Sequence, residues 1–296
     1  MNGLIRLDGG VATELMRAGM SLTEPWWSTV ALNTEPNRVI LRDVHERYLA
    51  AGAQVITANT FRCNARTLRR LGLDGAGHAW MVHAAIGVAM AARGGSDARV
   101  AASMAPVEDC FRPDLVPSDE ELRAEHRWLA TEISRSGVGL VLIETMNTSR
   151  EARIALEAAQ AAGCQGWVSF VCDAEGRVLS GERLGPVAKA AVHDGAEAVL
   201  VNCTSPDGTE RALGELRESC SGPIGCYPNL EDRGDLPPGA PSGRYLAPVM
   251  SPEEFADVAA RWRREYAIDI LGGCCGTTPE HMRAAYSQTV GDGVDS

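Results

Sequence analysis

Three cysteines in two distant parts of the chain could together bind a metal ion. Cys203 directly follows the apolar run 196–202, and Cys274 and Cys275 stand in a glycine-rich segment after the run 268–271. Three thiolates with one open position are the ligand set of a catalytic zinc site, whereas a structural zinc site is closed by four ligands. The flanking glycines let the backbone turn so that neighbouring cysteines face one ion. The sequence therefore predicts one Zn²⁺ per chain at these cysteines.

The alternative is that these cysteines are buried structural residues, because free cysteine is among the most buried residue types. A strained disulfide between Cys274 and Cys275 is a further possibility. The remaining cysteines have no such grouping and are interpreted as structural: Cys63, Cys110, Cys164, Cys172, Cys220 and Cys226. The histidines all fall in segments with helical periodicity, which disfavours a hydrolytic zinc site built on imidazole: His45, His78, His83, His126, His193 and His281.

The predicted ligand set favours one kind of chemistry. A zinc ion bound by three thiolates carries net negative charge, so it is a weak Lewis acid for a carbonyl group or for water. It can still hold a substrate thiol as a thiolate at neutral pH, although a free thiol has a pKa near about 8.5. Such a site suits alkyl transfer to sulfur without a protein base.

Two carboxylates end strands on the same predicted edge. Asp8 is followed by two glycines, and Glu144 ends the run 139–144. Opposed across a barrel mouth, they could bind the ammonium of an amino-acid substrate, while backbone N–H groups near Gly9 and Gly10 take its carboxylate. The alternatives are plain turn chemistry for Asp8 and a helix cap or ion pair for Glu144.

Trp27 is a candidate for contact with a cationic methyl donor, since a sulfonium or quaternary ammonium group is attracted to an indole face. The same residue could instead anchor the long loop 9–33. A second long loop, 230–248, is rich in proline and glycine and is either a lid or an unstructured insertion.

The elements that must position these residues alternate along the chain. Short β-branched runs are followed by turns and then by segments of helical periodicity, which is typical of a parallel sheet. The predicted strands are 4–8, 54–58, 99–105, 139–144, 166–171, 196–202, 223–227 and 268–271. Eight such units in about 290 residues indicate an α/β fold, a single-domain (β/α)8 TIM barrel over residues 1–290 with a C-terminal tail at 291–296.

Helices are predicted between these strands, and three of them begin with the spacing of a capping box. The predicted helices include 36–51, 65–93, 119–136, 149–162, 185–193 and 252–266. The capping pairs are Ser118 with Glu121, Thr148 with Glu151, and Ser251 with Glu254. In a parallel barrel, each helix returns the chain to the start of the next strand. All strands therefore end at the same mouth, where active sites are built.

Composition excludes several classes of function. The 296 residues carry 28 basic and 39 acidic side chains, a formal charge of −11, which argues against a nucleic-acid partner. No apolar run approaches the about 20 residues that span a bilayer, so we expect no membrane partner. Nine cysteines, an odd number, fit reduced thiols or metal ligands, and the expected location is the cytoplasm. No residue pattern specifies an oligomeric state.

Several segments resemble the zinc-dependent homocysteine S-methyltransferases, in particular the compact members that use S-methylmethionine. The similar segments are 7–15, ITANTF at 56–61, 111–114, 143–145, 202–203, 227–229 and GGCCGTTPE at 272–280. The resemblance implies that Cys203, Cys274 and Cys275 bind zinc and act in catalysis, and that Asp8, Gly9 and Glu144 hold L-homocysteine. Further substrate-binding candidates are Trp27, Asn59, Thr60, Asn202, Tyr227 and Asn229.

The resemblance implies a reaction in which the homocysteine sulfur takes the fourth zinc position and attacks a donor methyl group, giving methionine. S-Methylmethionine is the favoured donor and S-adenosylmethionine a possible one. The chain departs from the compact members at Asn59-Thr60-Phe61 and after Tyr227-Pro228-Asn229, at the barrel mouth, so betaine or another onium donor stays open. Two functions without methyl transfer also stay open. One is a barrel hydrolase or lyase that uses Asp8 and Glu144 as acid and base, and the second is a non-catalytic thiol or zinc redox sensor.

Overall fold

Parallel strands and helices alternate along the chain, as the sequence predicts. The computed structural model describes residues 3–234, 236 and 244–291. Within these residues the strands are β1 (Ile5–Arg6), β2 (Val55–Ala58), β3 (Arg99–Met104), β4 (Leu140–Met146), β5 (Gln165–Phe170), β6 (Ala198–Asn202), β7 (Ile224–Tyr227) and β8 (Ile270–Leu271). Each lies within or within two residues of a predicted apolar run.

The strands form one parallel sheet in the order β1-β8-β7-β6-β5-β4-β3-β2. The two ends of this sheet meet through a parallel bridge between Leu7 and Val55. Main-chain hydrogen bonds support the closure: Asp8 N–H donates to Val55 O at 2.9 Å, and Gln54 N–H donates to Arg6 O at 2.7 Å. The predicted (β/α)8 barrel is therefore confirmed.

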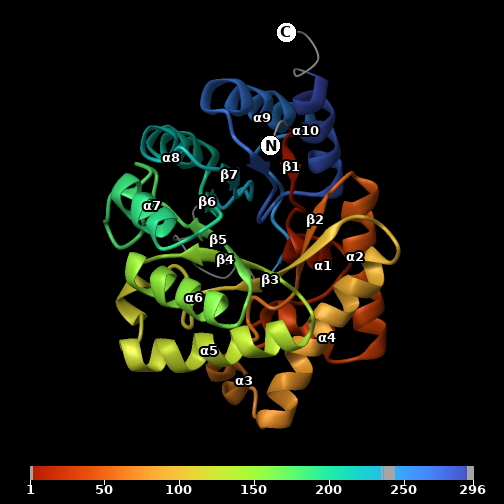
Figure 1. The fold of residues 1–296 in the computed structure, drawn as a ribbon. Helices are drawn as coiled ribbons and strands as arrows, with labels where there is room; N and C mark the ends of the chain where they lie inside the picture. The colour runs from red at the N-terminus through yellow and green to blue at the C-terminus, as the bar shows by residue number, and fades with distance from the viewer. Residues whose placement is uncertain (1–2, 235, 237–243, 292–296) are drawn as a thin grey trace.

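Helices form the outer layer around the strands (Figure 1). They are α1 (Val11–Arg17), α2 (Glu35–Ala50), α3 (Ala65–Arg70), α4 (Gly75–Arg93), α5 (Asp119–Arg135), α6 (Ser149–Ala161), α7 (Leu184–His193), α8 (Pro206–Ser219), α9 (Pro252–Tyr266) and α10 (Pro279–Gly291). Two 3₁₀ segments, η1 (Trp27–Leu32) and η2 (Pro113–Leu115), lie in the loops after β1 and β3. All six histidines fall in helices, as predicted.

Two of the three predicted capping boxes are complete. Both Ser118 with Glu121 and Ser251 with Glu254 make the reciprocal hydrogen bonds. At α6 only half of the box forms: Thr148 accepts from the Glu151 N–H at 3.3 Å. The Glu151 carboxylate turns inward instead, where it accepts from the Val107 N–H at 2.8 Å and lies 3.0 Å from a ring nitrogen of His126.

The single helix predicted over 65–93 is wrong, because the structure has two. Gly72 adopts a positive φ of 74°, which ends α3. Asp74 then caps α4, and its side chain accepts from the Gly77 N–H at 2.8 Å. The helical periodicity on either side hid this four-residue break.

The core has two parts. An inner group fills the barrel and includes Leu7, Leu142, Trp167 and Leu200. A larger group lies between the sheet and the helices. Since strand residues alternate between these two environments, the polar residues that point inward near the strand ends are available to a site at the barrel mouth.

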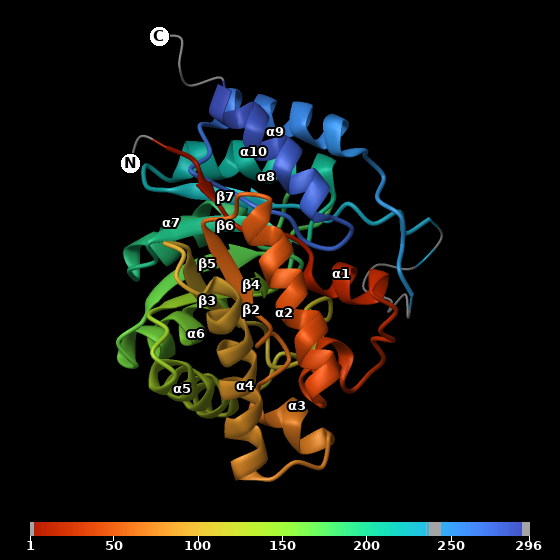
Figure 2. The same cartoon turned by 90° about the vertical axis from the view of Figure 1, so that its right-hand side faces the viewer.

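The two long loops lie at the mouth formed by the carboxyl ends of the strands. Figure 2 shows α1, from the first loop, at the same end of the molecule as the described parts of the loop after β7. In that second loop Glu231 pairs with Pro248 in an antiparallel bridge. Residues 235 and 237–243, the middle of the predicted lid, lie outside the described residues, as do residues 292–296 of the predicted tail. The tail boundary at 290 stays a prediction.

None of the helices in the described part of the chain is long and apolar enough to cross a membrane.

Candidate active site

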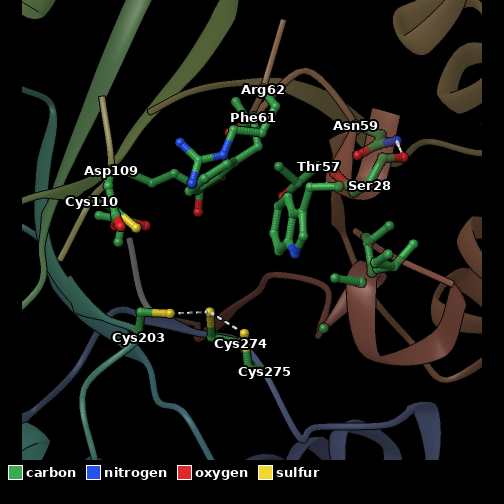
Figure 3. A pocket seen from close by; sticks show the side chains of 18 of the residues that line it. Ser28, Thr57, Asn59, Phe61, Arg62, Asp109, Cys110, Cys203, Cys274 and Cys275 are labelled. Atoms are coloured by element: carbon green, nitrogen blue, oxygen red, sulfur yellow. Dashed lines mark hydrogen bonds between the residues drawn. The ribbon is translucent and has the colours of Figure 1, made fainter. Parts of the chain in front are cut away.

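A cavity of about 600 Å³ opens at the carboxyl ends of the strands. Its wall combines strand-end residues, such as Asp8, Glu144 and Cys203, with residues from the loops after β1, β2 and β3. Figure 3 shows the three cysteine sulfurs on one side of the cavity and Phe61 and Arg62 on the opposite side. The place is the one at which barrel enzymes build their active sites.

The three predicted zinc ligands meet in this cavity. The Sγ atom of Cys274 lies 3.1 Å from that of Cys203 and 4.0 Å from that of Cys275. All three sulfur atoms lie within 4.8 Å of one another, and no other such group of possible ligands occurs among the described residues. All nine cysteines are free, so the disulfide alternative is wrong. The six other cysteines are buried, as predicted.

The backbone around the cysteines is built to bring them together. Cys203 has a φ of 53°, which is rare for a residue with a side chain. Its N–H donates to Tyr227 O at 3.2 Å, and the Cys274 N–H donates to Pro228 O at 2.9 Å. Gly276 has a φ of 79°, and a Cβ there would lie 2.5 Å from the Glu231 backbone nitrogen. A glycine is therefore required directly after the cysteine pair.

The sulfur cluster fits a zinc ion in donor type and spacing. A tetrahedral site with Zn–S bonds of about 2.3 Å places its sulfur atoms about 3.8 Å apart, between the Sγ–Sγ distances of 3.1 and 4.0 Å. Hydrogen bonds from Cys203 and then from Cys275 lower the pKa of Cys274, so one thiolate is stabilised in the cluster. The buried carboxylates nearby add negative charge, which favours a bound cation.

Asp8 lines the cavity and is almost fully buried. Its two carboxylate oxygens accept from the Thr57 N–H at 2.7 Å and the Thr57 hydroxyl at 2.8 Å. Burial raises the pKa of Asp8 to about 7, against the lowering effect of these hydrogen bonds. The turn alternative for Asp8 is wrong, because its partner is on β2 and not in its own turn.

Glu144 projects into the cavity from an irregular part of β4. The register with β5 shifts between Ile143 and Met146, and Thr145 has a φ of 58°. The Ser103 hydroxyl donates to the Glu144 carboxylate. Burial raises the pKa of Glu144 to about 7, the Ser103 bond lowers it, and the charge of Asp8 raises it. No ion pair of the described residues includes Glu144, so the ion-pair alternative is not supported. Asp8 and Glu144 thus form a buried acidic pair.

The two glycines after Asp8 have different roles. Gly9 lines the cavity, and a Cβ there would lie 2.6 Å from the Tyr48 ring. The Gly10 N–H donates to the Thr277 hydroxyl at 2.9 Å. The expectation that the Gly10 N–H donates to a substrate carboxylate is therefore wrong, because the Thr277 hydroxyl already accepts its hydrogen bond.

The predicted aromatic residue Trp27 lines the outer part of the cavity. Its ring centroid lies 5.3 Å from that of Phe61 at a tilt of 54°. The Arg62 guanidinium carbon lies 5.9 Å from the Trp27 centroid and 5.3 Å from the Phe61 centroid. Trp27 therefore both faces the cavity and packs within its own loop.

The remaining candidates divide into wall residues and supporting residues. Asn59 and Tyr227 line the cavity, whereas Thr60, Asn202 and Asn229 are absent from its described wall. Asn202 is fully buried; its Oδ1 accepts from the Thr145 N–H at 2.9 Å and the Ser169 hydroxyl at 2.7 Å. Asn202 therefore fixes the irregular end of β4 that carries Glu144.

Thr60 and Asn229 also use their side chains on protein partners. The Thr60 hydroxyl donates to Ser103 O at 2.7 Å. The Asn229 Oδ1 accepts from the Glu231 N–H at 2.8 Å. These two bonds hold the loops after β2 and β7, so direct substrate contact by Thr60 and Asn229 stays a prediction without support from their positions.

Sequence reasoning missed several residues of the cavity. Thr57 and Ser103 are polar residues inside apolar strands, and this interruption was the signal that could have found them. Arg62 carried no signal in the sequence. Glu231 also lines the cavity; burial and then Cys275 raise its pKa to about 7, although Arg233 pairs with it at 3.1 Å.

Comparison with known proteins agrees with this geometry. A selenocysteine Se-methyltransferase of Brassica oleracea var. italica is 28% identical over 317 residues, covering 97% of this chain and 89% of that protein. The metallated form of the homocysteine methyltransferase MmuM from Escherichia coli is similar with a TM-score of 0.81 at 26% identity, covering 97% of this chain and 96% of that one. The apo form of MmuM gives a TM-score of 0.74, at 26% identity and the same coverage.

The sequence profile of one family matches residues 5–289, nearly the whole chain, and its description is homocysteine S-methyltransferase. The profile, the barrel and the cysteine cluster agree with the resemblance to the homocysteine S-methyltransferases, and membership of that family is confirmed. The chain belongs to the homocysteine S-methyltransferase family.

Proposed function

We propose that the cavity transfers a methyl group from a sulfonium donor to the thiolate of L-homocysteine, giving methionine, with one zinc ion held by Cys203, Cys274 and Cys275. S-Methylmethionine is the favoured donor and S-adenosylmethionine the second. The observation that carries the proposal is the meeting of three free thiols at the wall of a cavity that also contains a buried acidic pair.

Zinc, when bound by three thiolates, supplies a fourth position for a substrate thiol and holds that thiol as a thiolate. The protein residues supply the rest. Asp8 and Glu144 bind the homocysteine ammonium between them, and the cation in turn favours their ionised forms. Thr57 and Ser103 hold the two carboxylates in place.

The reaction balances without a protein base. A bond forms between the homocysteine sulfur and the donor methyl carbon, while the bond from that carbon to the donor sulfonium breaks, and its electron pair stays on the donor sulfur. The thiol proton leaves to solvent when the thiolate forms. With S-methylmethionine as donor, both products are methionine.

The outer cavity is suited to a cation. Glu24 and Asp109 line it together with Trp27 and Phe61, whereas the Glu108 carboxylate of the same wall is bound by Arg70. Acidic side chains raise the local concentration of a positively charged donor, and aromatic faces attract its sulfonium group. A betaine or other onium donor would use the same features, and it is the alternative donor class. A cytoplasmic location, where thiols stay reduced, is part of the proposal.

The direct test is an incubation of the zinc-loaded protein with homocysteine and a panel of donors. S-Methylmethionine, S-adenosylmethionine, betaine and a trimethylsulfonium salt are each supplied with a ¹³C-labelled methyl group, and labelled methionine is measured by mass spectrometry. We expect the largest signal with S-methylmethionine. Activity that survives removal of zinc would instead favour a hydrolase or lyase based on the carboxylates. Absence of labelled methionine with every donor, together with reversible oxidation of the cysteines, would favour a redox sensor.

A further inference from the structure

Arg62 stands out among the charged residues of the cavity wall, because its charge is poorly neutralised. Its side chain is 14% exposed and lines the cavity just after β2. One terminal nitrogen donates to the Glu108 carbonyl oxygen at 3.2 Å. The ion-pair contact with Glu24 is 4.0 Å long, beyond hydrogen-bond distance. The buried Nε has no hydrogen-bond partner among the described residues.

The two other arginines of the wall lie closer to a carboxylate than Arg62 does. Arg70 binds both carboxylate oxygens of Glu108, at 2.8 and 2.9 Å. Arg233 forms an ion pair with Glu231 at 3.1 Å. A buried guanidinium group with unused donors is costly unless a ligand completes its hydrogen bonds. Arg62 is therefore the wall arginine best prepared to bind an anionic group.

The position of Arg62 favours contact with the methyl donor over contact with the acceptor, homocysteine. Figure 3 shows Arg62 beside Phe61, across the cavity from Cys203, Cys274 and Cys275. Its guanidinium group lies against the faces of Trp27 and Phe61, which restrict its orientation. The acidic pair of Asp8 and Glu144 belongs to the strand ends, on the acceptor's part of the cavity.

The chemistry of the guanidinium group specifies the ligand. Its planar fork matches the two oxygens of a carboxylate, and charge-assisted hydrogen bonds of this kind are about twice as strong as neutral ones. A bare onium cation would be repelled by Arg62. A donor that carries a carboxylate at a distance from its onium centre would gain from both the arginine and the aromatic residues.

We propose that Arg62 determines donor specificity by binding the carboxylate of a zwitterionic onium donor. This inference rests on the proposed function, since it assigns a part of the donor to a residue of the same cavity. It predicts that the enzyme prefers onium compounds that carry a carboxylate over compounds that are otherwise identical but lack it.

The test compares S-methylmethionine with its decarboxylated analogue, (3-aminopropyl)dimethylsulfonium. The zinc-loaded enzyme and the variants Arg62→Gln and Arg62→Lys are measured for KM and kcat with each donor and with homocysteine. Isothermal titration gives the dissociation constant of each sulfonium compound. The control is Arg112→Gln, an exposed arginine that pairs with Asp114 outside the cavity.

We expect Arg62→Gln to raise KM and the dissociation constant for S-methylmethionine about 10- to 100-fold, the effect of losing a charge-assisted hydrogen bond. Values for the decarboxylated analogue should stay the same or improve, because a repelling charge is removed. Arg62→Lys should recover part of the affinity, since a lysine keeps the charge but not the fork. The Arg112→Gln control should match the unmodified enzyme with both donors.

Two outcomes would overturn the assignment. Equal losses with both donors would show that Arg62 only supports the loop, and a raised KM for homocysteine alone would assign Arg62 to the acceptor. Failure of the unmodified enzyme to transfer a methyl group from either compound would instead contradict S-methylmethionine as the donor in the proposed function. The two dissociation constants would still decide whether Arg62 recognises a carboxylate.

Discussion

The inner and outer parts of the cavity are built in different ways. The inner part, Asp8, Glu144, Cys203, Cys274 and Cys275, comes from residues at or just beyond strand ends. Hydrogen bonds from neighbouring strands hold it, as Thr57 does for Asp8. The outer part, Trp27, Phe61 and Arg62, comes from loops after β1 and β2 and is held by ring contacts.

This difference separates two kinds of specificity. A site on strand ends is fixed by the sheet, so the same acceptor chemistry can persist while the loops change. A site on loops can be altered without affecting the barrel. The acceptor is therefore the better determined half of the proposed reaction, and the donor depends on the residues in which this chain departs from compact family members.

The largest expected effect comes from removing a proposed zinc ligand of the inner part. We expect Cys203→Ser to reduce the bound zinc from about one ion per chain to a small fraction and methyl transfer by at least about 100-fold. Elemental analysis of the purified protein and the labelled-methionine assay measure the two effects. Cys220→Ser, at the end of α8, is the control and should keep both. A Cys203→Ser protein with full zinc content would show that Cys203 is not a zinc ligand, and the distinction between the inner and outer parts would fail.

An intermediate effect is expected from Asp8→Asn, which removes a buried charge of the inner part. Burial raises the pKa of Asp8 from its usual 3.8 to about 7. Between these values the unfolded chain loses the proton while the folded chain keeps it, so this contribution to stability is complete below about pH 4 and is lost as the pH rises through 7. From pH 6 to pH 8 the loss is about 1 kcal/mol.

Asp8→Asn should therefore remove this part of the pH dependence and be the more stable protein at pH 8, although it binds homocysteine more weakly. Urea unfolding at pH 6, 7 and 8 measures the free energy of unfolding, and calorimetric titration measures the binding. The exposed Asp207→Asn serves as the control for stability. If Asp8→Asn is less stable than the unmodified protein at pH 8, the carboxylate stabilises the inner part and our account of its burial is wrong.

The smallest effect is expected in the outer part. Trp27→Leu should raise KM for the sulfonium donor about 2- to 5-fold, the value of a partly exposed cation–π contact, and leave KM for homocysteine unchanged. Trp80→Leu is a matched control, because Trp80 also packs against an arginine, Arg38 at 5.5 Å, but on the outside of the barrel. A change in KM for homocysteine would show that the two parts are not independent.

The sequence predicted the barrel and the inner part because both follow from position along the chain. In a parallel barrel every strand ends at the same mouth, so Asp8, Glu144 and Cys203 had to converge once their strands were found. The histidines could be set aside for the same reason. The resemblance in GGCCGTTPE added the cysteine pair and its function.

The details that the sequence did not predict depend on partners from other strands. The Gly10 N–H is occupied because Thr277, far along the chain, reaches it, and Glu151 leaves its cap because His126 and Val107 offer buried partners. Arg62 could not be recognised, since its incomplete pairing is visible only when Glu24 and Glu108 are placed around it. Local sequence patterns predict on which element a residue lies. They do not predict which residues from distant parts of the chain become its hydrogen-bond partners.

Asp8 has a second role at the closure of the sheet, where β1 meets β2. The sheet closes there through few main-chain bonds, and the Asp8 side chain reaches across the joint to Thr57. Asp8, which we propose to bind the substrate ammonium, thus also links β1 to β2 through its hydrogen bonds with Thr57. Opening of the barrel wall at this joint would break these hydrogen bonds, so solvent exchange of the Asp8 and Gln54 amide protons would report how often the barrel opens there.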